Sequence, residues 1–477
     1  MRMIGVLLAA MLVAPIATNA QSAPTAIPAD SPAKARPAEG PPVPHVSFDG
    51  PALTFDFPEV QIGSAEYEEG PTGATVLVFP KPVIAAVDVR GGAPGTVDTE
   101  YLRLAYDDPS VNAITLAGGS AYGESVATGV ENALKERIAD PGGWDNIPGT
   151  SGAIIFDLGE RRYNAVTPDE RLARAALNAV RSGWVPLGAR GAGRFAMQGG
   201  FFDNEPQHSG QGAAFRLSGE TKVLVVTVVN ASGAIVDRNG RVLRCAHPVA
   251  GDCGAISERI AKHLAALGAT KHADASLGRH SGLTANTTIT VVVTNKPLPF
   301  WALQRLAVQV HTSMARAIQP FSTSGDGDTL FAVTTGGKGT AISEDDLDDL
   351  GLLASETAWD AILASIPPLP PVPPRTDLTL TSAMADACIG RYEFAPVAIA
   401  ELRRNGEGLE IEVTGRKSLY IPVGKWVPLT LVASDEFELG TPRADRLHLD
   451  RDAHGRIVGL TINPGPWPVR ARRLQPN

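Results

Sequence analysis

The chain has 477 residues and a formal net charge of −9, from 42 basic and 51 acidic residues. Its hydrophobic fraction of 44% argues against a disordered protein, and the lack of a strong basic run argues against a nucleic-acid binder. With 3 cysteines it is not a disulfide scaffold, and its length predicts two to four domains, or one large domain with an appendage.

The first residues have the pattern of an export signal. Arg2 precedes an apolar stretch from Ile4 to Ile16 that is too short to span a bilayer, and small residues stand just before Gln21. We therefore predict a signal peptide at 1–20, a Pro/Ala-rich leader at 21–45, and a periplasmic or secreted protein with no membrane span after signal removal. A retained membrane anchor is the alternative.

A proline-rich stretch at 366–375 marks the clearest boundary, because repeated proline favours an extended, semi-rigid linker. It divides a main domain at 46–365 from a smaller domain at 376–477. Strands and helices of the main domain do not alternate strictly, which favours a layered α+β or αββα build over a doubly wound sheet. The predicted strands are 74–79, 84–89, 153–156, 222–229, 288–294 and 330–334, and the predicted helices are 125–137, 168–181, 255–267, 301–318 and 344–365.

The small domain is predicted to be all-β. Short β-rich runs are separated by turn signals such as Asn405-Gly406, and no catalytic cluster is found among them. We expect this domain to have a binding, packing or stabilising role. The predicted strands are 392–394, 409–414, 418–422, 430–432, 446–450 and 457–462.

Cysteine and histidine indicate no metal site. Cys245 and Cys253 lie in a turn-rich stretch and can pair in an oxidising compartment, whereas Cys245, His247 and Cys253 alone supply too few ligands for a metal. The other histidines show no zinc-binding spacing, and Ser120 in GGSAYG lacks the GxSxG spacing of a serine hydrolase.

The stretch GLTANTTITVVVTN at 282–295 can carry a nucleophile. An Asn286–Thr287 bond at a strand edge can be cut by the threonine hydroxyl through an N→O acyl shift, which leaves Thr287 as a new N-terminus. Such a threonine holds nucleophile and base on one residue. The alternatives are an ordinary turn before a strand, and a glycosylation acceptor at Asn286.

A second cluster lies in FSTSGDGDTLFAVTT at 321–335. Asp326 and Asp328 are two residues apart, so in extended backbone they share one face and can hold a hydroxyl and an ammonium. A solvated Asp-Gly turn and a calcium loop are the alternatives.

Glycine-rich loops and one asparagine complete the set of candidates. The loops at 89–96 and 116–123 follow strand-like runs but match no nucleotide-binding pattern, so we expect them to let backbone pass close to an active centre. Asn230 ends a predicted strand, where its side chain can donate to an oxyanion or act as a turn residue.

Taken in order, these stretches resemble the self-processing P1 peptidase family, which includes D-aminopeptidase/esterases, β-peptidyl aminopeptidases and, most similar here, nylon oligomer hydrolases. The resemblance covers about 50–365. The stretches are FDFPEVQIGSAEYEEGPTGATVLVFP (55–80), VDVRGGAPGT (87–96), AITLAGGSAYGESVATGV (113–130), GQGAAFR (210–216), VVNASGAIVD (228–237), NTTITVVVTN (286–295), QVHTSMARAIQPFSTSGDGDTLFAVTT (309–335) and ASETAWDAIL (354–363).

The resemblance implies a four-layer αββα fold of the N-terminal-nucleophile type, like that of ornithine acetyltransferase, with the small all-β domain appended. It implies cleavage at 286/287 into two chains that stay associated, in a homotetramer without a cofactor. By resemblance Thr287 is the nucleophile, Asp326 and Asp328 orient and activate it, and Asn230 contacts the oxyanion or substrate.

Two positions depart from the nylon oligomer hydrolases. Phe156 stands where they carry a tyrosine, and Gly200 where they carry a lysine, so the pocket is expected to be more apolar. Arg194 or Gln198 is a candidate to compensate, and Tyr122 is a further candidate pocket residue.

We therefore predict an amidohydrolase that acts on linear ω-amino-acid oligomers or short peptides through an acyl-enzyme on Thr287. A D- or β-aminopeptidase or esterase of the same family is the first alternative. A non-catalytic exported binding protein that keeps the fold is the second.

Overall fold

The computed structural model describes residues 41–104, 109–138, 146–158, 161–203, 206–246, 252–269, 286–368, 378–395, 398–415, 421–441, 445–463 and 468–475. The predicted signal peptide, most of the leader and most of the linker lie outside these residues, as do His247 and part of the predicted strand 418–422. None of the described helices is long and apolar enough to cross a membrane.

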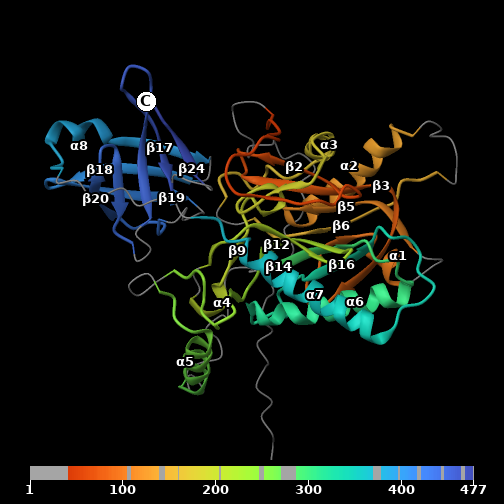
Figure 1. Ribbon diagram of the computed structural model, residues 1–477. Helices are drawn as coiled ribbons and strands as arrows, with labels where there is room; N and C mark the ends of the chain where they lie inside the picture. The colour runs from red at the N-terminus through yellow and green to blue at the C-terminus, as the bar shows by residue number, and fades with distance from the viewer. Residues whose placement is uncertain are drawn as a thin grey trace, which may run out of the picture. The chain divides into compact units, whose positions relative to one another are not determined.

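One mixed sheet forms the centre of the main domain (Figure 1). In the described part of the chain it has ten strands, in the order β11-β12-β14-β16-β3-β5-β6-β4, with β2 pairing to β3 and β7 pairing to β2. Their bounds are β2 Gln61–Tyr67, β3 Thr72–Val89, β4 Thr96–Val97, β5 Ser110–Ala117, β6 Thr150–Ile154, β7 Arg181–Ser182, β11 Gln211–Ser218, β12 Thr221–Asn230, β14 Thr287–Thr294 and β16 Thr329–Thr334. Short strands outside this sheet are β1 Ala52–Thr54, β8 Trp184–Pro186, β9 Met197–Gln198, β10 Gln207–His208, β13 Ala234–Ile235 and β15 Ile318–Gln319.

Strand β14 lies inside this sheet. It runs antiparallel to β12 and parallel to β16, and β16 runs antiparallel to β3. All residues of β14 are buried, as its continuous β-branched run TTITVVVT predicts for a strand covered on both faces. The first residue of β14, Thr287, therefore lies at a fixed place in the register.

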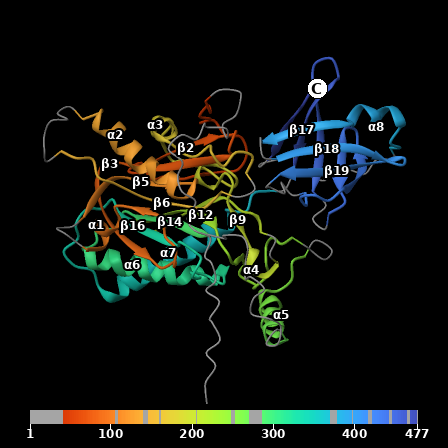
Figure 2. The same cartoon turned by 180° about the vertical axis from the view of Figure 1, so that it is seen from behind.

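Helices lie on opposite sides of the strands, as Figures 1 and 2 both show. On one side α2 (Ser125–Lys135) and α3 (Glu170–Asn178) share an apolar cluster with alternate residues of β2, β3 and β5. On the other side α6 (Phe300–Ser313) and α7 (Glu344–Leu363) share a cluster with β12, β14 and β16. The remaining main-domain helices are α1 (Thr99–Leu104), α4 (Gly200–Asp203) and α5 (Ile256–Ala269).

A third cluster lies among the strands themselves. It contains Leu77, Ile114, Val226, Ile289 and Phe331, which alternate along their strands with the residues that face the helices. The strands thus bury both faces, as predicted from runs without polar alternation.

Three expectations for individual elements need correction. The predicted strands 74–79 and 84–89 form one strand, β3, because Pro80 to Pro82 stay exposed while the pairing with β5 shifts between Val78 and Val83. The helix predicted at 168–181 is α3, which begins only at Glu170, because the Asp169 carboxylate caps it by accepting from the Leu172 N–H. The helix expected to reach Ile318 ends at Ser313.

The described residues of 378–475 contain helix α8 (Ser382–Cys388) and a closed barrel. Most of the predicted strands are present, and β18, β21 and β24 are additional. The barrel strands are β17 Gly390–Ala395, β18 Ala398–Asn405, β19 Gly408–Gly415, β20 Val427–Ala433, β21 Glu436–Leu439, β22 Arg446–Arg451, β23 Ile457–Ile462 and β24 Val469–Arg473.

Cys245 and Cys253 form a disulfide, with their Cα atoms 5.7 Å apart. The pairing that the sequence left open is therefore present. Both half-buried cysteines pack against a small apolar cluster that includes Val242 and Ile256. Cys388 is free and buried.

Candidate active site

The bond between Asn286 and Thr287 lies where three segments of the chain meet. Thr287 opens β14 and is 3% exposed. Asn230, the last residue of β12, opposes Thr287 in the antiparallel register, and Asn286 forms a parallel bridge with Asp326 before β16. The fold therefore brings together four residues that lie far apart in the sequence.

The carbonyl group of Asn286 is held by two donors. The Thr287 hydroxyl donates to the Asn286 carbonyl oxygen at 2.6 Å, and the Gly327 N–H donates to the same oxygen at 2.7 Å. On its other side Asn286 donates its N–H to the Gly325 carbonyl at 3.1 Å and its amide Nδ2 to the Ser232 hydroxyl at 2.6 Å. The peptide before Thr287 is thus fixed in direction and its carbonyl is polarised.

Asp326 is 1% exposed and holds two loops together. Its Oδ1 accepts from the Ser232 N–H at 3.1 Å. Its Oδ2 accepts from the Thr323 N–H at 2.9 Å and from the Thr323 hydroxyl at 2.6 Å.

Asp328 is fully buried and holds the strand that follows Thr287. Its Oδ1 accepts from the Thr288 N–H at 2.6 Å and its Oδ2 from the Ser322 N–H at 2.9 Å. Burial, and then the charge of Asp326, raise the pKa of Asp328 to about 7, while the donated hydrogen bonds act in the opposite direction. A carboxyl group that titrates near neutrality and lies beside a candidate nucleophile suits proton transfer.

These contacts argue against a solvated turn and a calcium loop at the two aspartates, and they show which groups the carboxylates bind. The aspartates are not a solvated turn, since both are buried. Nor do they form a calcium loop, because each carboxylate oxygen faces an N–H donor, whose partial positive charge repels a cation. Among the described residues no hydrogen bond joins either carboxylate to the Thr287 hydroxyl; in the uncut chain they hold backbone amides instead.

The glycine-rich loop at 89–96 packs against the two aspartates, as expected. The N–H groups of Arg90 and Gly91 donate to the Asp328 carbonyl at 3.0 and 3.2 Å, and the Ala93 N–H donates to the Asp326 carbonyl at 2.8 Å. A Cβ atom on Gly91 would lie 2.2 Å from the Asp328 nitrogen, so only glycine permits this approach.

The side-chain amide of Asn230 is locked in one orientation. Its Oδ1 accepts from the Met197 N–H at 2.9 Å, and its Nδ2 donates to the Phe156 carbonyl at 3.1 Å. An amide NH₂ carries two hydrogens, so one remains to donate elsewhere. The contact also places Phe156, a predicted pocket residue, next to Asn230.

The second glycine-rich loop, at 116–123, is tied to the residue after Phe156. The buried Asp157 carboxylate accepts from the Gly119 N–H at 2.7 Å and from the Thr72 hydroxyl at 2.6 Å, and it pairs with Arg161 at 3.3 Å. Tyr122 in this loop is 65% exposed, and among the described residues no hydrogen bond links it to Thr287.

Gly200 opens α4, close to the site. Its neighbours Gly199 and Phe201 donate their N–H groups to the carbonyls of Gly233 and Ser232, at 2.9 and 3.0 Å. The polar residues suggested as compensation are engaged elsewhere. Arg194 pairs with Glu66 at 3.2 Å and Glu68 at 2.9 Å. Gln198 bonds the backbone of Arg244 and Ile235.

Two residues of the site were not identified from the sequence. Gly327 acts through its backbone N–H, which no side-chain pattern reveals, although it stands between the two aspartates. Ser232, which contacts both Asn286 and Asp326, lies two residues after Asn230 in the stretch VVNASGAIVD. Its position in that stretch was the available signal.

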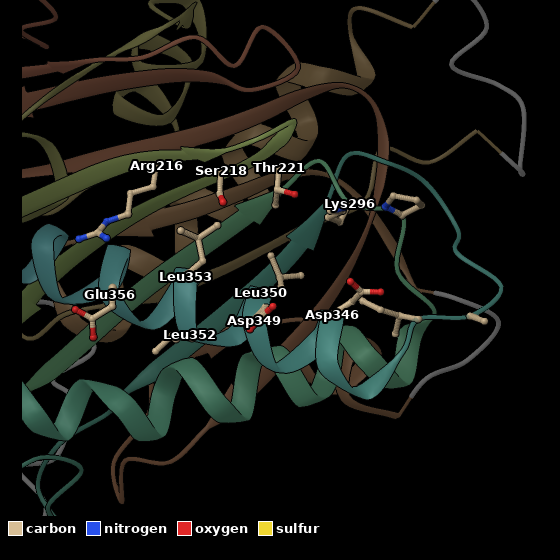
Figure 3. Close-up of a pocket in the computed structure, with 13 residues that line it drawn as sticks. Arg216, Ser218, Thr221, Lys296, Asp346, Asp349, Leu350, Leu352, Leu353 and Glu356 are labelled. Carbon is tan, nitrogen blue, oxygen red and sulfur yellow. The ribbon is translucent and has the colours of Figure 1, made fainter.

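A groove of about 680 Å³ lies at the opposite end of β14 from Thr287 (Figure 3). It is lined by the turn after β14, the ends of β11 and β12, and one face of α7. The lining includes Lys296, Thr221, Asp349, Leu350 and Leu353. This hollow is therefore separate from the site at Thr287.

Comparison with known proteins identifies the class. The model of Peptidase family S58 matches residues 52–368, and the chain belongs to this family. It is a hydrolase of amide or peptide bonds, so the non-catalytic alternative is not retained. The resemblance found in the sequence is confirmed.

Two relatives show where the chain lies within the family. It is 41% identical over 328 residues to a 6-aminohexanoate-oligomer endohydrolase of Paenarthrobacter ureafaciens, covering 65% of this chain and 85% of that protein. It is 37% identical over 268 residues to an uncharacterized aminopeptidase of Mycobacterium tuberculosis, covering 55% and 73%. Among solved structures, a Burkholderia sp. beta-aminopeptidase covers 65% of this chain and 84% of its own at 19% identity and a TM-score of 0.47.

Proposed function

We propose that the protein is a self-processing N-terminal-threonine amidohydrolase that cleaves amide bonds of linear ω-amino-acid oligomers of the 6-aminohexanoate type or of short peptides. The observation that carries this proposal is the Thr287 hydroxyl, 2.6 Å from the carbonyl oxygen of the preceding residue, which also accepts the Gly327 N–H. A hydroxyl beside a polarised carbonyl is the starting geometry for an N→O acyl shift.

In the proposed self-cleavage the Thr287 oxygen attacks the Asn286 carbonyl carbon, and its proton passes to the Thr287 nitrogen, which is the leaving group. The Gly327 N–H stabilises the charge that develops on the Asn286 oxygen. The C–N bond then breaks, the Thr287 nitrogen leaves as an amine, and an ester joins the two residues. Water hydrolyses the ester, which leaves an Asn286 carboxylate and a free Thr287.

In turnover the freed Thr287 hydroxyl attacks the substrate carbonyl and its own α-amine accepts the proton. Once the Asn286 carbonyl has moved away, the Gly327 N–H becomes available to the substrate, and together with the remaining Asn230 Nδ2 hydrogen it donates to the oxyanion. The amine product leaves, and water releases the acid from the Thr287 ester. Asp328 keeps the start of β14 in place through the Thr288 N–H.

N-terminal sequencing of the smaller fragment tests the proposal directly. After expression of the full chain we expect two fragments on a denaturing gel, the smaller one starting Thr-Thr-Ile-Thr at residue 287. The Thr287→Ala variant should stay uncut and inactive, whereas Thr288→Ala should be cut, because the buried Thr288 hydroxyl has no hydrogen-bond partner among the described residues. A single intact wild-type chain, or a fragment with another first residue, contradicts the proposal.

The aminopeptidases among the relatives support a second candidate, an exo-acting aminopeptidase on D- or β-amino N-termini. Product analysis on a 6-aminohexanoate oligomer separates the two. Internal cleavage gives mixed short oligomers from the start, whereas exo-trimming releases one monomer at a time.

We further propose that the main domain has the four-layer αββα arrangement. The three apolar clusters support it, since one lies among the strands and two lie between strands and helices. Export to the periplasm or exterior and a homotetrameric assembly remain proposals of the same kind, testable by cell fractionation and by light scattering.

A further inference from the structure

A buried histidine lies behind the loop that carries the two aspartates. His311 is on α6, which packs against β3 and β16 (Figure 1). It is fully buried, and its Nδ1 lies 2.9 Å from Oδ2 of Asp88 on β3. The same carboxylate accepts from Arg90 Nε at 2.5 Å. The mechanism proposed above uses none of these three side chains.

His311 touches both segments that hold Asp328. Through Asp88 it is linked to Arg90, whose N–H, with that of Gly91, donates to the Asp328 carbonyl. Its ring also packs edge-on against Phe321, with the centroids 5.5 Å apart, and the next residue, Ser322, donates its N–H to the Asp328 carboxylate. One imidazole thus supports the backbone and the side chain of Asp328 from two directions.

The protonation states of His311 and Asp88 suit a lasting hydrogen bond between them. Burial lowers the pKa of His311 even though Asp88 acts in the opposite direction, so the imidazole is neutral near pH 7. Although burial raises it, the hydrogen bonds from His311 and Arg90 hold the pKa of Asp88 below its usual value, so Asp88 is ionised. The hydrogen on a neutral His311 is then assigned to Nδ1, where it bonds the carboxylate.

We infer that His311 is a positioning residue for both self-cleavage and turnover, because it joins Asp88 and Phe321 and so fixes the two segments that grip Asp328. This inference rests on the proposed function. His311 is assigned no contact with substrate. It acts by holding Asp328 in position, and Asp328 in turn holds the Thr288 N–H that follows the nucleophile.

Three variants of the full chain test the inference. His311→Leu removes the bond to Asp88. His311→Asn places an amide nitrogen where Nδ1 lies and so restores a donor to Asp88. Leu306→Ala, a change at a fully buried residue of the same helix whose side chain makes no hydrogen bond, is the matched control for loss of packing. The rate of fragment formation and the kcat and KM of the cut enzyme on a 6-aminohexanoate oligomer are measured at a temperature where all variants are folded.

We expect His311→Leu to lower both the cleavage rate and kcat by on the order of 10- to 100-fold with KM nearly unchanged, since small misplacements of reacting groups have effects of this size. His311→Asn should recover most of the loss, and Leu306→Ala should match wild type. Wild-type rates in His311→Leu, or equal losses in His311→Leu and Leu306→Ala, would overturn the inference and leave the proposed function intact. An uncut wild-type chain would overturn both.

Discussion

The two ends of β14 differ in burial and in hydrogen bonding. At its first residue, Thr287 is buried, and hydrogen bonds occupy the Asn286 carbonyl and both aspartates. Beyond its last residue, the turn that follows β14 lines an open groove of about 680 Å³, with Lys296 and Asp349 on its walls (Figure 3). A hollow of this size is an ordinary first choice for a ligand site.

Under the proposed function, the difference between the ends is what a self-processing chain would show before it is cut. The reacting hydroxyl would be in contact with its own peptide bond, and the Asn286 carbonyl would fill the place where substrate binds. The pattern of donors around that carbonyl, rather than a hollow, indicates the chemistry.

The largest expected effect comes from crowding the buried end. A Cβ atom at position 327 would lie 2.8 Å from the Thr287 hydroxyl oxygen and 2.7 Å from the Ala93 carbonyl oxygen, so the backbone here would have to shift. Gly327→Ala should therefore displace the N–H from the Asn286 carbonyl and slow self-cleavage roughly 100-fold or more, as loss of an oxyanion donor does. A time course on denaturing gels measures the rate.

Gly408→Ala is the control for this substitution, because a Cβ there meets nothing closer than 3.5 Å. It should be cut like wild type. Normal cleavage of Gly327→Ala would show that the N–H at 327 is not needed.

Asp328 gives the buried end a pH dependence. Its pKa is raised from 3.8 to about 7, so the folded chain favours the protonated form. The stability that this contributes is complete below the unfolded pKa and is lost as the pH rises through the folded pKa. In the uncut Thr287→Ala background we expect the free energy of unfolding to fall by on the order of a few kcal/mol from about pH 4 to about pH 8. Urea unfolding measures this fall, which Asp328→Asn should make smaller.

Glu66 on β2 provides the comparison. Burial raises its pKa from 4.5 to about 7, although the charge of Arg194 acts in the opposite direction. Glu66 therefore also lowers the free energy of unfolding as the pH rises. Glu66→Gln should remove only its own share. If it removes the whole slope and Asp328→Asn removes none, the assignment to Asp328 is wrong.

A smaller effect is expected at Phe156 and Gly200, the two positions predicted to depart from the nylon oligomer hydrolases. A Cβ at position 200 lies 3.4 Å or more from its neighbours in Pro206, so the first side-chain atom of a lysine meets only ordinary contacts, and Phe156→Tyr adds only a hydroxyl. The double variant should raise kcat/KM on 6-aminohexanoate oligomers about two- to tenfold, the value of one added hydrogen bond. Gly200→Leu with Phe156→Tyr, of similar bulk and without the charge, should give less; an equal gain would show that the ammonium is not involved.

The smallest effects belong to the groove. Lys296→Ala and Asp349→Asn alter its walls at the far end of β14, and distant sites generally act independently. Cleavage rate and kcat should stay within a factor of about two of wild type. A loss comparable to that of Gly327→Ala would mean that the groove, and not only the buried end, takes part in the reaction.

The sequence predicted individual elements better than their assembly. Continuous apolar runs identified β12, β14 and β16, because burial on both faces leaves a signature in one strand alone. The Pro80–Pro82 segment suggested two separate strands. In the structure β3 continues through these exposed residues, and only its register with β5 shifts. Nor do alternating residues in the tail reveal that β17 pairs with β24 to close a barrel, since closure depends on residues at the two ends of the domain.

The candidate site was predictable where it depends on side-chain type and neighbouring positions. Asn230, Asn286, Thr287, Asp326 and Asp328 were all named from short motifs, and the structure brings them together. The Gly327 N–H was not, because every residue but proline has one and only the fold aims it. His311 and Asp88 are separated by 223 residues, so their contact has no local pattern at all.

The order of strands in the sheet decides what a cut at Asn286–Thr287 would do to the molecule as a whole. β14 and β16 are adjacent, with β12 beyond one and β3 beyond the other. The shorter product would therefore be wedged into the sheet of the longer one, with a backbone ladder on each flank, and its helices α6 and α7 would cover apolar residues that the longer product supplies. Within the main domain, neither product would have a finished core of its own. The protein would lose a covalent link and remain one cooperative unit, since the halves could part only by unfolding together.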